Sequence, residues 1–205
     1  MDYIIDNTIQ FIVLLICTFY AIRQAFGQKS REWTLLAFFF GDFALDDLYL
    51  ILCQLTVGWT ETLSVVSELS WYASFLFLYL LICQLAPMEE RGEKRFLPWL
   101  GPVFSMAMAG FFMQWGDVVS NLIYGVVMGL VLFAAISRLI RRERFGHARF
   151  ICIMAIVLCL LEYAMWTVSG YFREGLLSYI YYLFDLMITL CFPLFIIGTS
   201  KAVKK

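Results

Sequence analysis

The chain has 205 residues, of which 62% are apolar and 15% charged, with a net charge of -1. A soluble domain has about 45–50% apolar and about 25% charged residues. A water-soluble fold could not bury so much apolar surface, and the composition therefore predicts one domain, 1–205, embedded in a lipid bilayer.

The six cysteines all lie within apolar runs, and no C-x-x-C pair occurs. Cysteines in such positions behave as small hydrophobic side chains rather than as a disulfide framework. The first ten residues, MDYIIDNTIQ, carry acids where a signal peptide has basic residues. We therefore expect the first apolar stretch to be a retained membrane span.

Seven segments are long and apolar enough to cross the hydrocarbon as helices, which takes about 20 residues each. In chain order these predicted spans are 3–25, 33–55, 63–86, 97–116, 117–137, 148–171 and 176–199. The fourth and fifth meet in a tight turn at 114–117. The predicted fold class is an all-α integral membrane protein, a seven-transmembrane-helix bundle.

Lysine and arginine predict the orientation of the bundle. The loops at 26–32, 87–96 and 138–147, with their flanking residues and the C-terminal tail, carry 14 of the 15 basic residues. Only Arg173 is on the other side. Basic loops remain in the cytosol, so we expect the N-terminus outside, the C-terminus in the cytosol and a multi-pass protein of the cell membrane. The basic run 138–149 is interpreted as a topology anchor on anionic lipid headgroups, not as a nucleic-acid site.

Acidic residues, unlike basic ones, occur inside the predicted spans. They are Asp42, Asp46, Asp47, Glu68, Glu162 and Asp185. An ionised carboxylate near the centre of a span costs about 2.5–3.5 kcal/mol on insertion scales. Asp46, Glu162 and Asp185 each lie nine residues from the predicted outer end, roughly 14 Å deep at 1.5 Å per residue. Their shared depth predicts one outward-facing site.

Aromatic side chains accompany these acids at helical spacing, as in the wall of a ligand pocket. The candidate ligand- or ion-binding residues are Asp42, Asp46, Glu68, Trp71, Glu162, Tyr163, Trp166, Tyr182 and Asp185. The alternative is that the carboxyls are protonated and only hydrogen-bond between helices. No metal ligand set, cofactor or catalytic residue is predicted.

Several chemistries are excluded by missing residues. The only histidine, His147, lies in a predicted cytosolic loop, so haem, histidine–zinc and Ser-His-Asp sites cannot form in the bundle. The last span lacks the lysine of microbial rhodopsins. Phe39-Phe40-Gly41-Asp42 lacks the first glycine of the intramembrane aspartyl protease motif, and no Pro-Gln signature of the PQ-loop group occurs.

The leading hypothesis is a receptor- or sensor-like protein that binds a small cationic or polar ligand in an outward-facing acidic and aromatic pocket. The apolar cytosolic half of the spans disfavours a pore. A sensor with such short loops requires a cytosolic or membrane partner protein. The second hypothesis is a proton- or cation-coupled transporter, and the third is an intramembrane enzyme that uses two carboxylates as acid and base.

Overall fold

The computed structural model describes residues 2–56, 64–85, 96–140, 148–171 and 179–203, and all regular structure in these ranges is helical. The elements are α1 (Asp2–Gln28), α2 (Arg31–Thr56), α3 (Ser64–Leu85), the short 3-10 helix η2 (Leu97–Trp99), α4 (Leu100–Phe112), α5 (Val118–Ile140), α6 (Arg149–Tyr171) and α7 (Tyr179–Val203). The predicted all-helical class is confirmed, and each α-helix begins and ends within about four residues of a predicted span.

Five of these helices are long and apolar enough to cross a membrane, namely α1, α3, α5, α6 and α7. The chain is therefore a helical protein of multi-pass membrane type. Helix α2 has 26 residues, but its three central aspartates exclude it from this group. Helix α4 has 13 residues, about 20 Å at 1.5 Å per residue, and is shorter than the hydrocarbon. Seven spans therefore remain a prediction.

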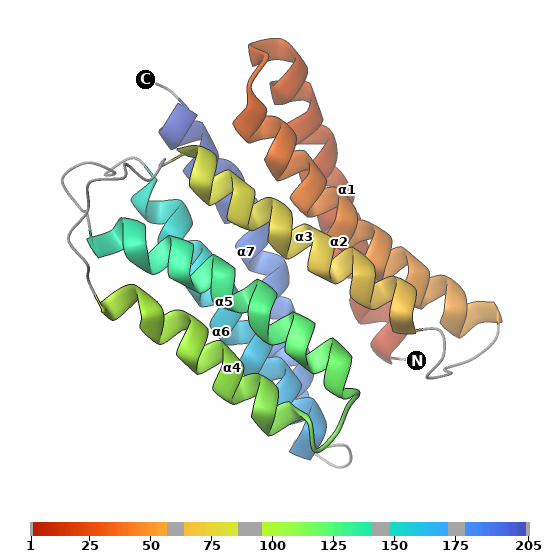
Figure 1. Ribbon diagram of the computed structural model, residues 1–205. Coiled ribbons are helices and arrows are strands. Elements are labelled where there is room, and N and C mark those ends of the chain that lie inside the picture. Colours follow the sequence, from red (N-terminus) through yellow and green to blue (C-terminus); the bar gives the residue numbers. More distant parts are fainter. Residues whose placement is uncertain (1, 57–63, 86–95, 141–147, 172–178, 204–205) are drawn as a thin grey trace.

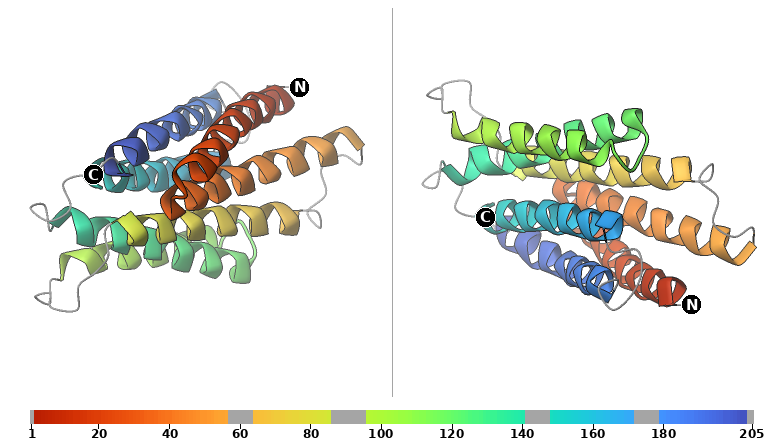
Figure 2. Two further views of the ribbon diagram at one scale, coloured as in Figure 1. Left: turned by 90° about the horizontal axis from the view of Figure 1, so that it is seen from above. Right: turned by 90° about the horizontal axis from the view of Figure 1, so that it is seen from below.

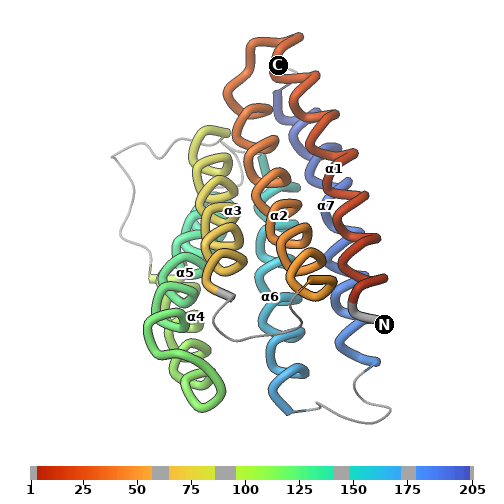
Figure 3. Tube along the Cα trace, turned by 90° about the vertical axis from the view of Figure 1, so that its right-hand side faces the viewer, coloured from red at the N-terminus to blue at the C-terminus, as the bar shows by residue number. Residues whose placement is uncertain are grey.

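Six helices form a closed ring, and the seventh packs on its outside. The ring order is α1, α2, α3, α5, α6, α7, and α7 returns to contact α1. Helices α2 and α7, and helices α3 and α6, also touch across the ring over a smaller contact area. Helix α4 packs against α5 at the edge of the bundle, as Figures 2 and 3 show. Residues from distant parts of the sequence can therefore meet inside the ring.

Successive helices run in opposite directions, so alternate connections lie at the same end of the bundle (Figure 1). The basic residues that the structure describes gather at the end where α1, α3, α5 and α7 finish. They are Arg23, Lys29, Arg31, Arg138, Arg149 and Lys201. The other nine basic residues used to predict the orientation lie outside the described ranges. They are Arg91, Lys94, Arg95, Arg141, Arg142, Arg144, Arg173, Lys204 and Lys205. His147 also lies outside these ranges.

The turn between α4 and α5 has a clear local cause. Asp117 caps α5, because its Oδ2 accepts a hydrogen bond from the Ser120 backbone N–H at 2.9 Å. The Asn121 side chain donates to the Asp117 carbonyl at 2.8 Å and to the Phe112 carbonyl at 3.4 Å. These bonds occupy backbone groups that the two helix ends leave free. The predicted turn at 114–117 lies at this position.

Small residues bring α4 and α5 close together. A Cβ atom added at Gly125 would lie 2.8 Å from Ala109 Cβ, and one at Gly129 would lie 3.2 Å from Pro102 Cα. Because membrane helices gain little from hydrophobic burial against each other, such close van der Waals contact is a main source of their association.

We predict that Gly125→Ala destabilises the bundle, because the added methyl group overlaps α4. Overpacking of this kind typically costs about 1–3 kcal/mol. Gly110→Ala on α4 is the matched control, because its Cβ meets nothing within 4 Å. Thermal unfolding in detergent should show a lower midpoint for Gly125→Ala only. Equal midpoints for the two variants would contradict the close α4–α5 contact.

Candidate functional site

Two adjacent aspartates in the middle of α2 point to different neighbours inside the ring. Asp46 and Asp47 are only 8% and 3% exposed. Consecutive helical residues project about 100° apart, and Asp46 therefore faces α3, where the Ser67 hydroxyl donates a hydrogen bond to its Oδ1. Asp47 faces α1 and α7. One short segment of α2 thus supplies carboxyls to both sides of the interior.

Gln10 on α1 connects Asp47 with α7. In the orientation that satisfies both ends of its amide, Gln10 Nε2 donates to Asp47 Oδ1 at 2.9 Å, and its oxygen accepts from Thr189 Oγ1 at 3.1 Å. Thr189 is one turn after Asp185, and its hydroxyl also lies 3.0 Å from the Asp185 carbonyl. A single buried amide therefore joins α1, α2 and α7.

Asp185 also has a carboxyl neighbour on α1. Asp6 and Asp185 are within hydrogen-bonding reach of each other. Two carboxyls can share a hydrogen bond only while one of them carries a proton. Asp6 Oδ2 and Asp185 Oδ2 are buried, and neither accepts a hydrogen bond from a donor group within the described part of the chain. The pair therefore retains acceptor capacity for a proton or another cation.

Glu162 on α6 lies among aromatic rings. It is 2% exposed, and the indoles of Trp71 and Trp166 lie beside its carboxyl. The rings of Trp71 and Tyr124 stack at 4.6 Å, and Tyr124 meets the ring of Tyr163 edge-on at 5.3 Å. Glu162 Oε2 and the Tyr124 hydroxyl have no hydrogen-bond partner among the described residues. Four rings thus enclose one carboxyl with unused acceptor capacity.

Glu68 occupies the edge of this region. It is half-buried, and its Oε2 accepts a hydrogen bond of 2.6 Å from the Ser120 hydroxyl on α5. The same serine provides its carbonyl to the Tyr72 hydroxyl at 3.1 Å. Glu68 is also close enough to Asp46 to interact with it electrostatically. Glu68 therefore lies next to the buried acids but is not itself buried.

Four buried carboxyls and the half-buried Asp6 form one electrostatic unit, which we call the acidic core and define as Asp6, Asp46, Asp47, Glu162 and Asp185. Asp47 interacts with the other four. Glu162 also interacts with Asp46, and Asp185 interacts with Glu162. The described lysines and arginines lie at the far ends of the helices, and none of them pairs with these carboxyls. The acidic core therefore concentrates charge of one sign inside the bundle.

A layer of phenylalanines lies directly on the cytosol-facing side of the acidic core in the predicted orientation. We call it the phenylalanine layer and define it as Phe39, Phe40, Phe43, Phe75, Phe192 and Phe195, all of which are buried. The rings contact one another across α2, α3 and α7, with centroids 5.2–6.1 Å apart. Phe43 is one turn from Asp46 and Asp47, so the transition from polar to apolar interior is abrupt.

Two residues of the predicted site lie elsewhere. Asp42 lines a groove between α1 and α2 on the outside of the helix ring. Tyr182 is half-buried on α7, where its ring meets those of Tyr179 and Tyr181. The structure brings Asp46, Glu162 and Asp185 together and surrounds Glu162 with Trp71, Tyr163 and Trp166.

The sequence interpretation did not include the α1 residues Asp6 and Gln10, and it omitted Asp47 and Tyr124 from the site. A signal for α1 was present, because Asn7, Gln10 and Leu14 begin a buried face that continues through Cys17 and Ala21. Polar residues on the inward face of a membrane helix indicate a polar neighbour.

Two further observations limit the chemistry. Among the described residues, no three His, Cys, Asp or Glu side chains are grouped so that they could hold a metal ion. All six cysteines are free thiols.

Comparison of the chain with known protein families, curated proteins and solved structures gives no match. The site must therefore be interpreted from its own geometry.

We predict that Gln10→Leu destabilises the bundle by about 1–3 kcal/mol, because it leaves the buried Asp47 carboxyl without its amide donor. Gln24→Leu is the control on the same helix, since Gln24 hydrogen-bonds only to the exposed Gln28. Chemical denaturation in detergent would measure both variants. A double-mutant cycle of Gln10→Leu with Thr189→Val should show coupling, and additive effects would refute the proposed connection between α1 and α7.

Proposed function

We propose that the chain spans the cell membrane seven times, with its N-terminus outside and its C-terminus in the cytosol. The distribution of basic residues supports this orientation, because the described ones gather at one end of the bundle. Helix α2 is long enough to span, and two of its three central aspartates, Asp46 and Asp47, face the protein interior rather than lipid. Helix α4 together with η2 would form the shortest span.

Within this arrangement we propose that the acidic core binds a small cationic ligand from the outer side. The observation that carries this proposal is the convergence of five carboxyls, four buried and one half-buried, from four helices with no basic partner among the described residues. Burying carboxylates without compensation is costly, so they must be neutralised by protons or by a bound cation. A site that takes up positive charge follows from this requirement.

The rings around Glu162 favour an organic cation. Trp71, Tyr124, Tyr163 and Trp166 present aromatic surfaces next to a carboxyl that retains an unpaired oxygen. Cations bind over aromatic faces through the ring quadrupole, and the interaction strengthens where water is excluded. A compact alkylammonium or guanidinium group combines the required charge with a surface that the rings can contact.

The phenylalanine layer favours binding over transport. It closes the interior between the acidic core and the cytosolic end, and a permeating ion needs polar groups along its whole route. We therefore propose a receptor- or sensor-like role, with the output transmitted through a partner protein because the loops are short.

A transporter is the second candidate, favoured by one specific feature. Pro193 lies within α7 between two members of the phenylalanine layer, Phe192 and Phe195. Proline removes a backbone hydrogen bond from a helix and permits a kink. Movement of α7 at this point would open the layer toward the cytosol.

A cysteine-accessibility scan tests the topology. With the six native cysteines replaced, single cysteines at Thr60 and Glu174 should react with an impermeant reagent in intact cells. Cysteines at Gly92 and Gly146 should react only after permeabilisation. All four positions lie outside the described residues and in predicted loops. Labelling of Gly146 in intact cells would overturn the orientation.

Binding of tetramethylammonium, guanidinium and Na⁺ to the protein in nanodiscs tests the site. We expect an organic cation to bind, and Glu162→Gln to weaken it at least tenfold, which is about 1.4 kcal/mol. Affinity should rise with pH, because protons compete for the same carboxyls. Asp42→Asn is the matched control and should leave binding unchanged, since Asp42 lies outside the acidic core.

Proteoliposomes separate the two candidate functions. A receptor should bind the cation without moving it across the bilayer, because the phenylalanine layer blocks the route. Uptake that depends on the cation and disappears in Asp185→Asn would reject the receptor proposal in favour of the transporter. Binding that is retained without uptake would reject the transporter.

A further inference from the structure

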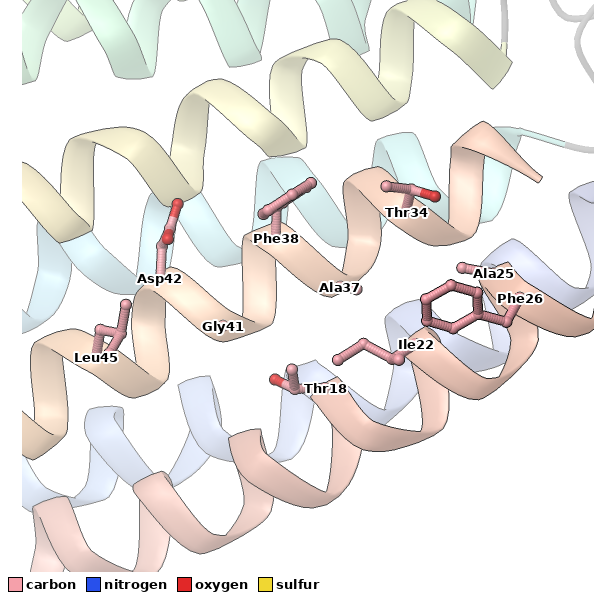
Figure 4. A pocket seen from close by; sticks show the side chains of 10 residues that line it. All are labelled: Thr18, Ile22, Ala25, Phe26, Thr34, Ala37, Phe38, Gly41, Asp42 and Leu45. Atoms are coloured by element: carbon pink, nitrogen blue, oxygen red, sulfur yellow. The ribbon is translucent and has the colours of Figure 1, made fainter. Parts of the chain in front are cut away.

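A groove of about 630 Å³ runs along the outer surface of the bundle between α1 and α2. Figure 4 shows its wall on α1, where Thr18, Ile22 and Phe26 reach toward α2. On α2, Thr34, Phe38 and Asp42 form one row at intervals of four residues along the rim of the groove, and Phe38 and Asp42 point away from α1 toward α3 (Figure 4), where Phe38 stacks on Phe77 at 4.9 Å. The groove is separate from the acidic core, which lies inside the ring.

Two phenylalanines that line the groove are largely exposed. Phe26 is 82% exposed and Phe38 is 51% exposed. Gly41 leaves the middle of the groove open, because a Cβ atom there would meet only Thr18 Cγ2 at 3.8 Å. In a membrane-spanning bundle this surface contacts the surrounding hydrocarbon or another protein.

Asp42 is the unusual member of this otherwise apolar surface. It is half-buried and makes no hydrogen bond or ion pair with any residue that the structure describes. It lies eleven residues after Arg31, where α2 begins, which is about 16 Å along the helix axis. That distance is close to half of the roughly 30 Å hydrocarbon thickness. A carboxyl at mid-membrane depth therefore faces outward without a partner.

The position of Asp42 restricts what can cover the groove. A lipid acyl chain would fill the apolar part but leave the carboxyl unpaired, and lipid headgroups lie too far toward the surface to reach it. A second copy of this chain has no matching cation, because its lysines and arginines lie at or beyond the ends of the spans. A different membrane helix with a basic residue near its centre satisfies both the groove and the charge.

We propose that the α1–α2 groove docks a transmembrane helix of a partner protein, and that a lysine or arginine near the middle of that helix pairs with Asp42. Basic residues at such depth are unfavourable in lipid and are stable when paired with an acid. The apolar walls and Gly41 allow the partner helix to approach closely. The proposal rests on α2 spanning the membrane, which the cysteine scan tests separately, and it does not depend on cation binding in the acidic core.

The experiment measures energy transfer between the labelled protein and synthetic transmembrane peptides in liposomes. One peptide is a leucine- and alanine-rich helix with a single central lysine, and the other has leucine in its place. We expect the lysine peptide to associate at least tenfold more strongly. Asp42→Asn should abolish this difference, and Asp42→Glu should preserve most of it.

Two further variants separate the groove from general effects on folding. Gly41→Phe should block the peptide by filling the groove, whereas Gly110→Phe on α4 should not, because Gly110 is exposed away from this site. Thermal unfolding of each variant would serve as the control for an intact bundle. Equal association of both peptides, or lysine-dependent association that persists in Asp42→Asn, would overturn the proposal. Displacement of the lysine peptide by lipid alone would assign the groove to a lipid and also overturn it.

Discussion

Uncompensated carboxyls in an apolar interior are the constraint on which the rest of this structure depends. Five acids lie inside the ring, and each must have a hydrogen-bond donor, a proton or a cation. Gln10, Thr189 and Ser67 supply part of this need and in doing so connect α1, α2, α3 and α7. The same part of the bundle therefore holds the polar groups that connect these helices and the carboxyls to which we assign cation binding.

The bundle separates two environments along its axis. The acidic core and the rings around Glu162 occupy one half, whereas the phenylalanine layer fills the other at close aromatic contact. The acidic core is therefore bordered by apolar rings on the side of the phenylalanine layer. A signal that begins with cation binding would reach the cytosolic half through rearrangement of α7, where Asp185, Thr189 and Pro193 follow one another along the helix.

Asp42 and Asp46 show why nearby residues on one helix can differ in role. They are four positions apart on α2, a spacing that rotates the side chain by only about 40°. In the ring Asp46 is buried and accepts a hydrogen bond from Ser67 on α3, whereas Asp42 is half-exposed at the rim of the groove, on the flank of α2 that is turned toward α3 (Figure 4). The position of the neighbouring helices decides which of the two carboxyls is interior.

The sequence by itself determined the helices, their approximate ends and the membrane character, because these depend on local composition and on the length of apolar runs. It also identified Asp46, Glu162 and Asp185 as a group by their depth. Tertiary structure alone decided that α4 lies outside the ring, and that Asp6 and Gln10 of α1 meet Asp47 and Asp185. The physical reason is that depth follows from position along a helix, whereas partnership depends on which faces the packed helices turn toward one another.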